Sequence, residues 1–397
     1  MTAGTSRPAG TGAARAGSAD APDVERRALV ALGRVVEPPA PALVPLVDAL
    51  GAVEVLERLR ADRLEGPTSR QVSAYRARLD LADVDRDLAM AARAGARLVV
   101  PGDREWPPAL HDLRAGRPLA LWVRGAAGTG LAAAVEHAVA VVGARAATAY
   151  GLHVAATLSA QVAARGWTVV SGGAFGIDAA AHRGALSVGG TTVAVLACGV
   201  DVAYPRAHEP LLSRVAQDGV LVSEVPPGTG VTRGRFLERN RLLAALSRGT
   251  VVVEAALRSG ARSTAERARE LCREVMAVPG PVTSPLSAGC HEEVRARQAA
   301  LVTDGDDVLD IVGQLGVDSR PERRAPPGPL DVLDPEDLRV YDAMPLHGAV
   351  PAGQLARASL LPVPDVLGRL GRMAVQGLVE ATDRGWRRAV PTARRHG

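Results

Sequence analysis

The sequence predicts an α/β fold: a Rossmann-like, doubly wound and mostly parallel sheet, preceded by a helical region and followed by a winged-helix-like domain. Between about residues 97 and 313, short β-branched runs alternate with Ala-rich stretches of helical pattern, which is typical of βαβ units. The runs are apolar almost throughout, as expected of strands that helices cover on both faces. On either side of this region, apolar residues recur every three or four positions, which indicates helices.

Six runs are predicted to be strands of this sheet. They span residues 139–142, 168–170, 192–196, 220–222, 250–253 and 275–278. In a doubly wound fold, ligands bind beyond the carboxyl ends of the strands. A binding site is therefore expected in the segments that directly follow these runs.

The chain is predicted to have five parts. Residues 1–22 lack periodicity and are expected to be disordered. Residues 23–95 are expected to form a helical domain. The remaining parts are a Rossmann-like domain at 96–318, a charged Pro-rich linker at 319–329 and a winged-helix-like domain at 330–392.

The C-terminal domain is predicted from the order helix, helix, longer helix and hairpin, which resembles a winged helix. The apolar side of the third helix is expected to face a core and consists of Val363, Val366, Leu367, Leu370, Met373 and Ala374. Arg369, Arg372 and Gln376 lie on the opposite face. That face is expected to meet DNA or a protein partner, unless it is merely solvated.

The composition sets the size and charge of the molecule. The 397 residues and 47% hydrophobic content allow two or three domains with substantial cores. All 47 basic residues are arginine, which binds phosphate through a planar fork of N–H groups. The scarcity of Lys, Asn, Ile and Phe also fits a GC-rich coding bias, so arginine content alone does not indicate nucleic acid. A net charge of +4 is only a weak argument for it.

Cysteine content and hydropathy indicate the compartment. Cys198, Cys272 and Cys290 are odd in number and show no CxxC spacing, so neither a disulfide framework nor a zinc site is predicted. No uncharged run reaches the roughly 18 residues that suggest a membrane helix. The chain is expected to be cytoplasmic, without a membrane partner and without a metal or cofactor.

The segment SGGAFGID (171–178) follows a predicted strand and opens an Ala-rich helix. Ser171, Gly172, Gly173 and Gly176 let backbone amides approach an anion at the helix N-terminus, so a phosphate site is predicted here. The pattern is neither GxGxxG nor a Walker motif, and no dinucleotide or ATP is required. A tight strand-to-helix turn without a ligand explains the glycines equally well.

The segment GARAATAYG (143–151) connects a strand to a helix, with Arg145 in the loop. A guanidinium at this position is able to clamp a phosphate with two N–H groups. The alternative is an ordinary surface arginine in an arginine-rich chain.

The segment RFLERNR carries the chain's only asparagine, Asn240, between Arg239 and Arg241. Phe236 in this segment and Phe175 in the glycine-rich loop are the only two phenylalanines. Arginine binds phosphate, an aromatic ring stacks on bases, and asparagine hydrogen-bonds a base edge or the backbone. Both segments are therefore predicted to be ligand loops. The alternative places Phe236 in the core and makes Asn240 a helix cap.

The segment EAALRSGARSTA again runs from a strand into a helix. The hydroxyls and amides of Ser259, Gly260 and Thr264 are expected to converge on the same edge of the sheet. The alternative is ordinary N-capping by Ser263 or Thr264. Glu254 is expected to order an arginine rather than to act as a base.

Together these segments resemble the DNA-processing protein A family over about residues 97–313. The matching strings, in the family's order, are VGARAATAYG, SGGAFGID, GGTTVAVLACGVDVAYP, SEVPPG, RFLERNRLLAALS, VVVEAALRSGARSTA and VMAVPG. The resemblance implies a Rossmann-like domain that binds single-stranded DNA, forms a homodimer and hands the strand to the RecA recombinase in natural transformation. It also implies that the DNA site is lined by Arg145, Ser171, Gly172, Arg239, Asn240 and Arg241. No catalytic residue is predicted.

The chain departs from the family pattern at two places. Ala261 and Arg262 stand where Ser and Leu are expected. Further on, His291, Glu292 and Glu293 replace an asparagine and an apolar pair. The two carboxylates are expected to make that surface less favourable for DNA.

Two other functions remain open. A nucleotide-processing hydrolase of the lysine-decarboxylase-like Rossmann group would need a glutamate where this chain has Arg267, and Glu266 points about 100° away on a helix. A regulator that binds double-stranded DNA through the winged helix would leave the strand-end segments unexplained.

Overall fold

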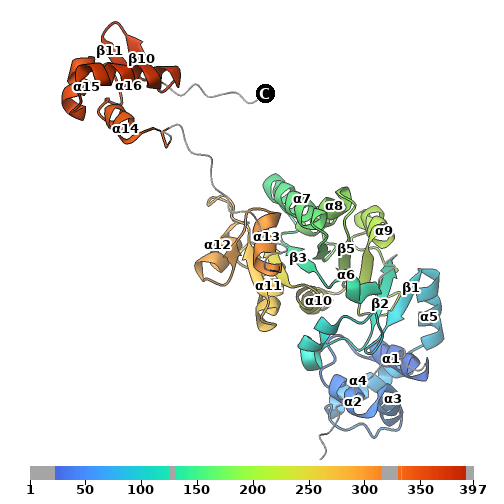
Figure 1. The fold of residues 1–397 in the computed structure, drawn as a ribbon. Helices are drawn as coiled ribbons and strands as arrows, with labels where there is room; N and C mark the ends of the chain where they lie inside the picture. The colour runs from blue at the N-terminus through green and yellow to red at the C-terminus, as the bar shows by residue number, and fades with distance from the viewer. Residues whose placement is uncertain (1–22, 126–129, 315–329, 332, 390–397) are drawn as a thin grey trace, which may run out of the picture. The chain divides into compact units, whose positions relative to one another are not determined.

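The computed structural model describes residues 23–125, 130–314, 330–331 and 333–389 (Figure 1). The predictions for residues 1–22 and for the linker at 319–329 lie outside these ranges. The chain divides into two compact units, Met1–Arg320 and Pro321–Gly397. No helix within the described ranges is long and apolar enough to cross a bilayer.

In the described part of the first unit, five helices precede the sheet. They are α1 (Asp23–Val35), α2 (Val44–Leu50), α3 (Ala52–Arg60), α4 (Ser69–Leu79) and α5 (Val84–Arg93). Leu32, Leu43 and Leu59 are fully buried among them. The same core includes Trp122 of the sheet. The predicted helical region is therefore present, and its apolar face is buried against one side of the sheet.

The described part of the first unit is built on a nine-stranded sheet of order β1-β2-β6-β5-β4-β3-β7-β8-β9. Its strands are β1 (Ala96–Val99), β2 (Leu121–Gly125), β3 (Ala138–Val142), β4 (Thr168–Ser171), β5 (Thr192–Leu196), β6 (Val220–Ser223), β7 (Gly249–Val252), β8 (Glu274–Ala277) and β9 (Ala300–Leu301). β3 to β9 are parallel, and β2 and β1 continue the sheet antiparallel beyond β6. The six predicted strands are β3 to β8, so the predicted doubly wound, mostly parallel sheet is confirmed.

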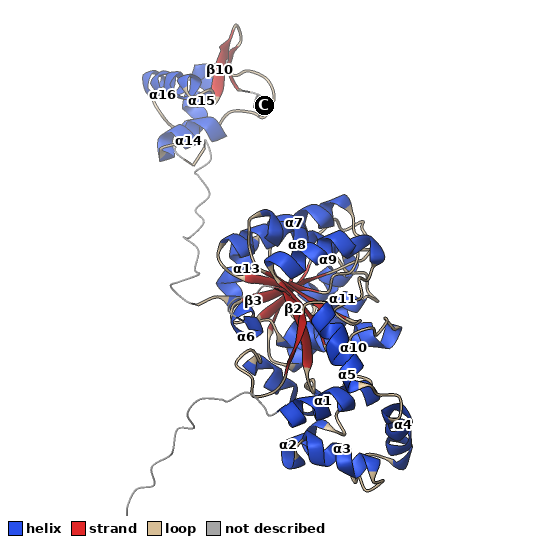
Figure 2. Ribbon diagram, turned by 90° about the vertical axis from the view of Figure 1, so that its right-hand side faces the viewer, coloured by secondary structure: helices blue, strands red, loops and turns tan. Residues whose placement is uncertain are grey.

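Helices cover both faces of this sheet (Figure 2). One face carries α7 (Ala149–Ala164), α8 (Ile177–Ser187), α9 (Glu209–Asp218) and α13 (Gly305–Val312). The other carries η1 (Pro108–Gly116), α6 (Gly130–Ala134), α10 (Arg233–Ala245), α11 (Gly260–Glu270) and α12 (Ala288–Arg295). Val141 of β3 packs toward the first layer and Val142 toward the second, as the alternation of a strand requires. The strand order reverses between β3 and β7, which places the switch point of the sheet there.

The second unit contains three helices and a hairpin in its described residues. They are α14 (Pro335–Asp342), α15 (Ala352–Ser359), α16 (Val363–Val375), β10 (Val379–Thr382) and β11 (Gly385–Arg388), the two strands being antiparallel. The buried residues of α16 are Val366, Leu370 and Met373. Val363 and Leu367 were expected in this core but are exposed, because the buried stripe of α16 is narrower than predicted. Gln376 is exposed, as predicted.

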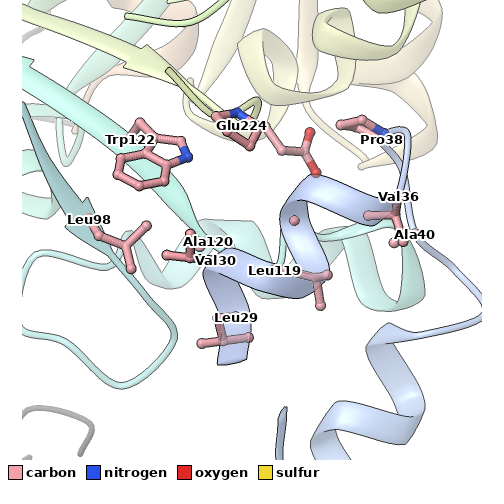
Figure 3. A pocket seen from close by; sticks show the side chains of 12 residues that line it. Leu29, Val30, Val36, Pro38, Ala40, Leu98, Leu119, Ala120, Trp122 and Glu224 are labelled. Carbon is pink, nitrogen blue, oxygen red and sulfur yellow. The ribbon is translucent and has the colours of Figure 1, made fainter. Parts of the chain in front are cut away.

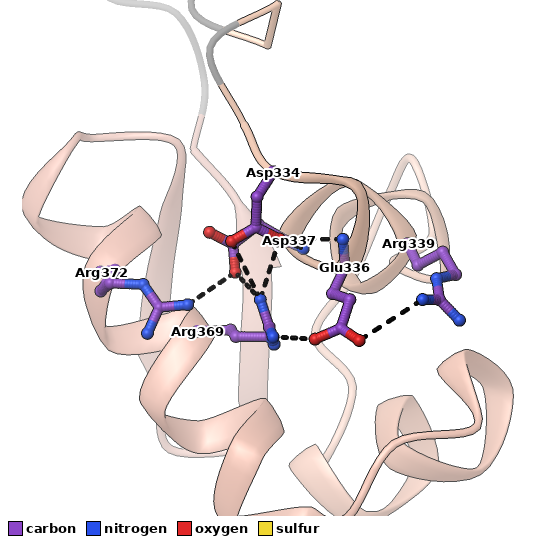
Figure 4. A network of polar contacts seen from close by, with 6 residues as sticks. All are labelled: Asp334, Glu336, Asp337, Arg339, Arg369 and Arg372. Atoms are coloured by element: carbon purple, nitrogen blue, oxygen red, sulfur yellow. Dashed lines mark hydrogen bonds and ion pairs between the residues drawn. The ribbon is translucent and has the colours of Figure 1, made fainter.

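Arg369 and Arg372 were predicted on the face of the third helix opposite its core, and in the structure both form ion pairs with acidic residues of α14 (Figure 4). Arg369 donates to Asp334 at 2.9 Å and to Asp337 at 2.8 Å. It also pairs with Glu336, and Arg372 donates to Asp337 at 3.0 Å. Asp334 caps α14 by accepting from the amides of Glu336 and Asp337. The acidic first turn of α14 thus neutralises the basic side chains of α16.

Candidate functional site

The polar segments singled out in the sequence meet at the carboxyl-end edge of the parallel strands. Residues 143–148 follow β3, residues 172–176 follow β4 and residues 253–259 follow β7, so all three lie at or beside the switch point. RFLERNR was expected in a loop but lies within α10, which Thr232 caps by accepting from the amide of Arg235. The loop after β6 leads into this helix and so returns the segment to the same edge.

The glycine loop after β4 is held by internal hydrogen bonds. Ser171 is fully buried, and its hydroxyl donates to the carbonyl oxygen of Val141 at 2.6 Å. The carbonyl oxygen of Gly173 lies 3.1 Å from Nδ1 of His208. Gly176 has a φ of 78°, and a Cβ there would collide with carbonyl oxygens of the β3 loop. These residues shape the loop, and the Ser171 hydroxyl is not turned toward a ligand.

Arg239 links three elements beneath this loop. It is buried, and its Nη1 donates to the carbonyl oxygen of Gly172 at 2.9 Å and to that of Val195. A Cβ on Gly172 would overlap the guanidinium, so only glycine leaves room for it. Burial lowers the pKa of Arg239, and the negative charge of the buried Asp178 opposes this shift. Arg239 therefore anchors α10 to β4 and β5.

Arg241 and Asn240 are buried as well. Nη2 of Arg241 donates to both carboxylate oxygens of Glu224 at 2.7 Å. Nδ2 of Asn240 donates to the carbonyl oxygen of Gly260 at 3.2 Å. Burial, more than any other cause, raises the pKa of Glu224. Arg239, Asn240 and Arg241 were predicted to line the DNA site; the structure buries them and directs their polar ends to other parts of this chain.

An exposed cluster of rings and one arginine lies above these buried residues. Arg145 is exposed, and its guanidinium carbon lies 4.5 Å from the centroid of the Phe236 ring, a cation–π contact between the β3 loop and α10. The ring of Tyr204, from the segment after β5, is 5.6 Å from that of Phe236. On the glycine loop, Phe175 meets His208 edge-on at 4.6 Å. Half-buried Phe236 is thus the centre of a surface cluster.

The most exposed aromatic residues of the described chain gather at this edge. Tyr150, Phe175 and Tyr204 are 41%, 47% and 40% exposed, and each follows the carboxyl end of a parallel strand. The hydroxyl of Tyr150 donates to the carbonyl oxygen of Pro279 at 2.6 Å, which fixes its ring. Tyr204 was not predicted as part of the site. A signal was present, since this residue follows a predicted strand in a chain with only four tyrosines.

The turn between β7 and α11 differs from the prediction in part. Ser259 occupies the N-cap position of α11, but its hydroxyl has no hydrogen-bond partner in the described chain. Gly260 is exposed as the first residue of the helix, whereas Thr264 is buried in its second turn. Capping by Ser263 or Thr264 does not occur, because both residues come after the helix has begun.

Two glutamates have internal roles that were not predicted. The carboxylate of Glu254 accepts from the amide of Thr148 at 2.9 Å and from its hydroxyl at 2.6 Å, so it orders the cap of α7 rather than an arginine. Glu293 is buried and accepts from Arg262 at 2.7 Å and from Arg269 at 2.8 Å. The expectation that Glu293 makes this surface negative is therefore wrong, since its charge is neutralised inside the protein.

The N-terminal helices hold the segment that leads into α10. Arg235, in the first turn of α10, donates to both carboxylate oxygens of Glu37 at 2.9 and 2.7 Å. Arg34 of α1 donates to the hydroxyl of Thr229 at 3.3 Å. Beside these contacts, a small apolar pocket lies between α1 and the sheet, and Figure 3 shows Glu224 among the residues that line it. The helical region therefore supports the edge on which the exposed rings lie.

The sequence model of the family described as DNA recombination-mediator protein A matches residues 97–313, more than half of the chain. The chain belongs to this family. A DprA protein of Mycobacterium tuberculosis is 48% identical over 378 residues, which cover 92% of this chain and 95% of that protein. DNA processing protein A of Streptococcus pneumoniae, a solved structure, is 30% identical with a TM-score of 0.59 and covers 73% of this chain and 96% of its own. A DNA processing protein A of Helicobacter pylori, solved for its single-stranded DNA binding mode, is 27% identical with a TM-score of 0.48 and covers 54% of this chain and 94% of its own.

The resemblance to the recombination-mediator family that the ordered segments predicted is thus confirmed. The family match begins within β1 and ends just after α13, so it covers nearly the whole sheet. All the exposed rings and buried arginines described above lie within it. The five N-terminal helices and the second unit fall outside the matched residues.

Proposed function

We propose that this chain binds single-stranded DNA across the carboxyl-end edge of its parallel sheet. The observation that carries the proposal is the gathering of the exposed rings Tyr150, Phe175 and Tyr204 at that edge. An exposed ring stacks on any base, with about 1–3 kcal/mol per base, so it suits a strand whose bases are unpaired. A duplex keeps its bases stacked inside and offers these rings no partner.

Phosphate contacts are assigned to exposed arginines rather than to the buried ones. Arg145, Arg206, Arg233 and Arg258 follow β3, β5, β6 and β7, are exposed, and make no ion pair or hydrogen bond with another described residue. Their N–H groups are therefore free to bind phosphate oxygens. Each phosphate neutralised in this way releases counterions, so binding is expected to weaken steeply with salt.

The bound strand is proposed to pass to a RecA recombinase, with the chain acting as a homodimer through its Rossmann-like domain. Both parts rest on membership of a family described as recombination mediators. Rings and phosphate-binding arginines hold a strand without selecting its bases. A protein that must deliver any sequence to a recombinase needs this kind of contact.

No catalytic activity is proposed. The hydrolase alternative needs a glutamate at the position of Arg267 in α11, but Arg267 pairs with Glu270 at 2.9 Å and Glu266 is exposed on the helix surface. Burial raises the pKa of Cys198 to about 11 and that of Cys290 to about 12, which keeps both thiols protonated and weakly nucleophilic at neutral pH. Nucleoside monophosphates and ATP are expected to give no turnover. Release of free base that is lost in Glu266→Ala would overturn this.

A regulator that reads duplex DNA through α16 is the weaker alternative, because Arg369 and Arg372 are already paired with acidic residues of α14.

The deciding experiment titrates the full chain with poly-dT and with a duplex of equal length across a range of salt concentrations. Tighter binding of the single strand, with steep salt dependence, is the expected result. Tighter binding of the duplex would overturn the proposal.

A further inference from the structure

A second cavity lies at the opposite edge of the sheet from the proposed DNA site. Its volume is about 510 Å³, and residues 245–248, Glu136 and Arg273 lie among its lining. These residues precede β7, β3 and β8, three parallel strands whose amino ends share one edge. Sites for small molecules typically enclose about 300–1,000 Å³, so the cavity has the size of such a site.

Ser247 lies beneath the wall of this cavity. Its hydroxyl is fully buried and has no hydrogen-bond partner among the described residues, so it does not face the open volume of the cavity. Its backbone carbonyl oxygen accepts from Nη1 of Arg273 at 2.9 Å. Ser247 therefore shapes the wall, and arginines supply the groups that reach a ligand.

Two arginines in the lining have free N–H groups. Nε of Arg248 donates to the backbone carbonyl oxygen of Glu136 at 3.0 Å, and its two terminal nitrogens have no acceptor among the described residues. Arg104 lines the same cavity, is exposed, and makes no ion pair or hydrogen bond with a described residue. Arg273, by contrast, is already paired with Asp112 at 2.8 Å. The free forks of Arg104 and Arg248 match the geometry of a phosphate group.

The rest of the lining limits which phosphate compound fits. Pro107 and Pro108 form an apolar wall, and the exposed Glu136 also borders the cavity. The Glu136 carboxylate repels a bare anion but accepts a hydrogen bond from a hydroxyl or amino group. A ligand with a phosphate at one end and a neutral, hydroxyl-bearing body at the other satisfies both requirements.

We propose that this cavity binds a nucleoside monophosphate. The phosphate binds Arg104 and Arg248, a sugar hydroxyl or base amino group donates to Glu136, and the base packs on the prolines. The proposal concerns binding without turnover. It is independent of the DNA site, because no lining residue belongs to the carboxyl-end edge.

The test measures binding of AMP to the full chain by calorimetry, with inorganic phosphate and adenosine as partial ligands. We expect saturable AMP binding at one site per chain and much weaker binding of either partial ligand. Arg248→Ala is expected to weaken AMP binding about tenfold or more, since it removes a charge-assisted contact. Ser247→Ala, a change beneath the cavity wall, is expected to leave AMP binding nearly unchanged.

Matched variants separate this site from the proposed DNA site. Arg145→Ala should leave AMP binding unchanged while weakening poly-dT binding, and Arg248→Ala should do the reverse; thermal unfolding shows that each variant is folded. Absence of saturable AMP binding, equal affinity for inorganic phosphate, or loss of AMP binding in Arg145→Ala but not in Arg248→Ala would each overturn the proposal. None of these outcomes bears on whether the chain binds single-stranded DNA.

Discussion

Nη1 of Arg239 donates to the carbonyl oxygen of Gly172 at 2.9 Å, and its guanidinium occupies the space that a side chain on Gly172 would need. The pair joins α10 to the loop after β4. The glycine is therefore required by a buried arginine of this chain, whatever ligand the loop binds.

Gly172→Ala is expected to destabilise the fold by about 1–3 kcal/mol, because a methyl group is forced into a filled space. Urea unfolding checks this, with Gly260→Ala as the control, since a Cβ at Gly260 meets nothing within 4 Å. The double variant Gly172→Ala with Arg239→Ala should lose less free energy of unfolding than the sum of the two single losses, because the new methyl group enters space that the Arg239 side chain has left. Strict additivity would show that the two residues do not interact.

Arg145→Ala is expected to weaken binding of single strands of every sequence, because a phosphate contact carries no base information. The log–log salt slope should fall by about 0.7, the value of one phosphate on a single strand. Arg214→Ala is the matched control, since Arg214 lies on α9 and is itself exposed. Unchanged affinity and slope in a folded Arg145→Ala protein would remove this residue from the site.

Tyr204→Ala and Phe175→Leu, which remove exposed rings, are expected to lower affinity for single strands by about 1–3 kcal/mol each while leaving the salt slope nearly unchanged. The reason is that they remove stacking rather than charge. Tyr204→Phe keeps the ring and should bind like the unchanged protein. A smaller salt slope in Tyr204→Ala would mean that the substitution removes a phosphate contact, which would contradict a stacking role for Tyr204.

Arg241→Ala is expected to destabilise the protein by about 3–5 kcal/mol, because it leaves the largely buried Glu224 carboxylate unpaired. Replacing both residues by apolar ones, Arg241→Met with Glu224→Leu, should recover most of this loss. Salt titrations of the folded double variant should show an unchanged slope. A slope reduced by one contact would instead restore Arg241 as a phosphate ligand.

His182 predicts a pH dependence of stability. Its Nδ1 lies 2.8 Å from the Thr192 hydroxyl, which itself donates to Val169, so Nδ1 carries the proton. Burial, helped by the charge of Arg239, lowers the pKa of His182 from 6.5 to about 3.

Between these two pH values the unfolded chain takes up a proton at His182 that the folded chain does not. Stability is therefore expected to fall as pH falls from about 6.5 toward 3, by up to about 1.4 kcal/mol per pH unit from this group. His182→Gln keeps a donor toward Thr192 without a titrating group and should flatten this part of the profile. An identical slope in the variant would assign the effect to other residues.

The sheet was predictable because strand and helix patterns depend on neighbouring residues. The β-branched runs became β3 to β8 nearly residue for residue. The strands β1, β2 and β9 were not predicted individually. The glycine loop, the β3 loop and the β7 turn were placed at one edge from strand order alone, since the carboxyl ends of parallel strands share an edge.

The roles of the charged residues could not be predicted in the same way. Nothing in the sequence around Arg239 and Arg241 distinguishes them from exposed arginines. They are buried because their partners Gly172 and Glu224, which lie 67 and 17 residues away in the chain, meet them in the fold. Arg369 was placed on a free face of its helix, but its acidic partner Asp337 lies 32 residues earlier. Helical periodicity indicates which face a residue occupies and not which side chain of another element meets it.

By itself, the sequence determined the α/β class, the order of the six predicted strands along the chain and the family to which the chain belongs, and it indicated the edge of the sheet at which we propose that DNA binds. Only the tertiary structure decided which arginines are free to bind phosphate and which hold the fold, and it alone brought Tyr204 beside Phe236. The physical reason is that secondary structure follows from local periodicity. An ion pair or a ring contact exists only once both partners are positioned by elements far apart in the chain.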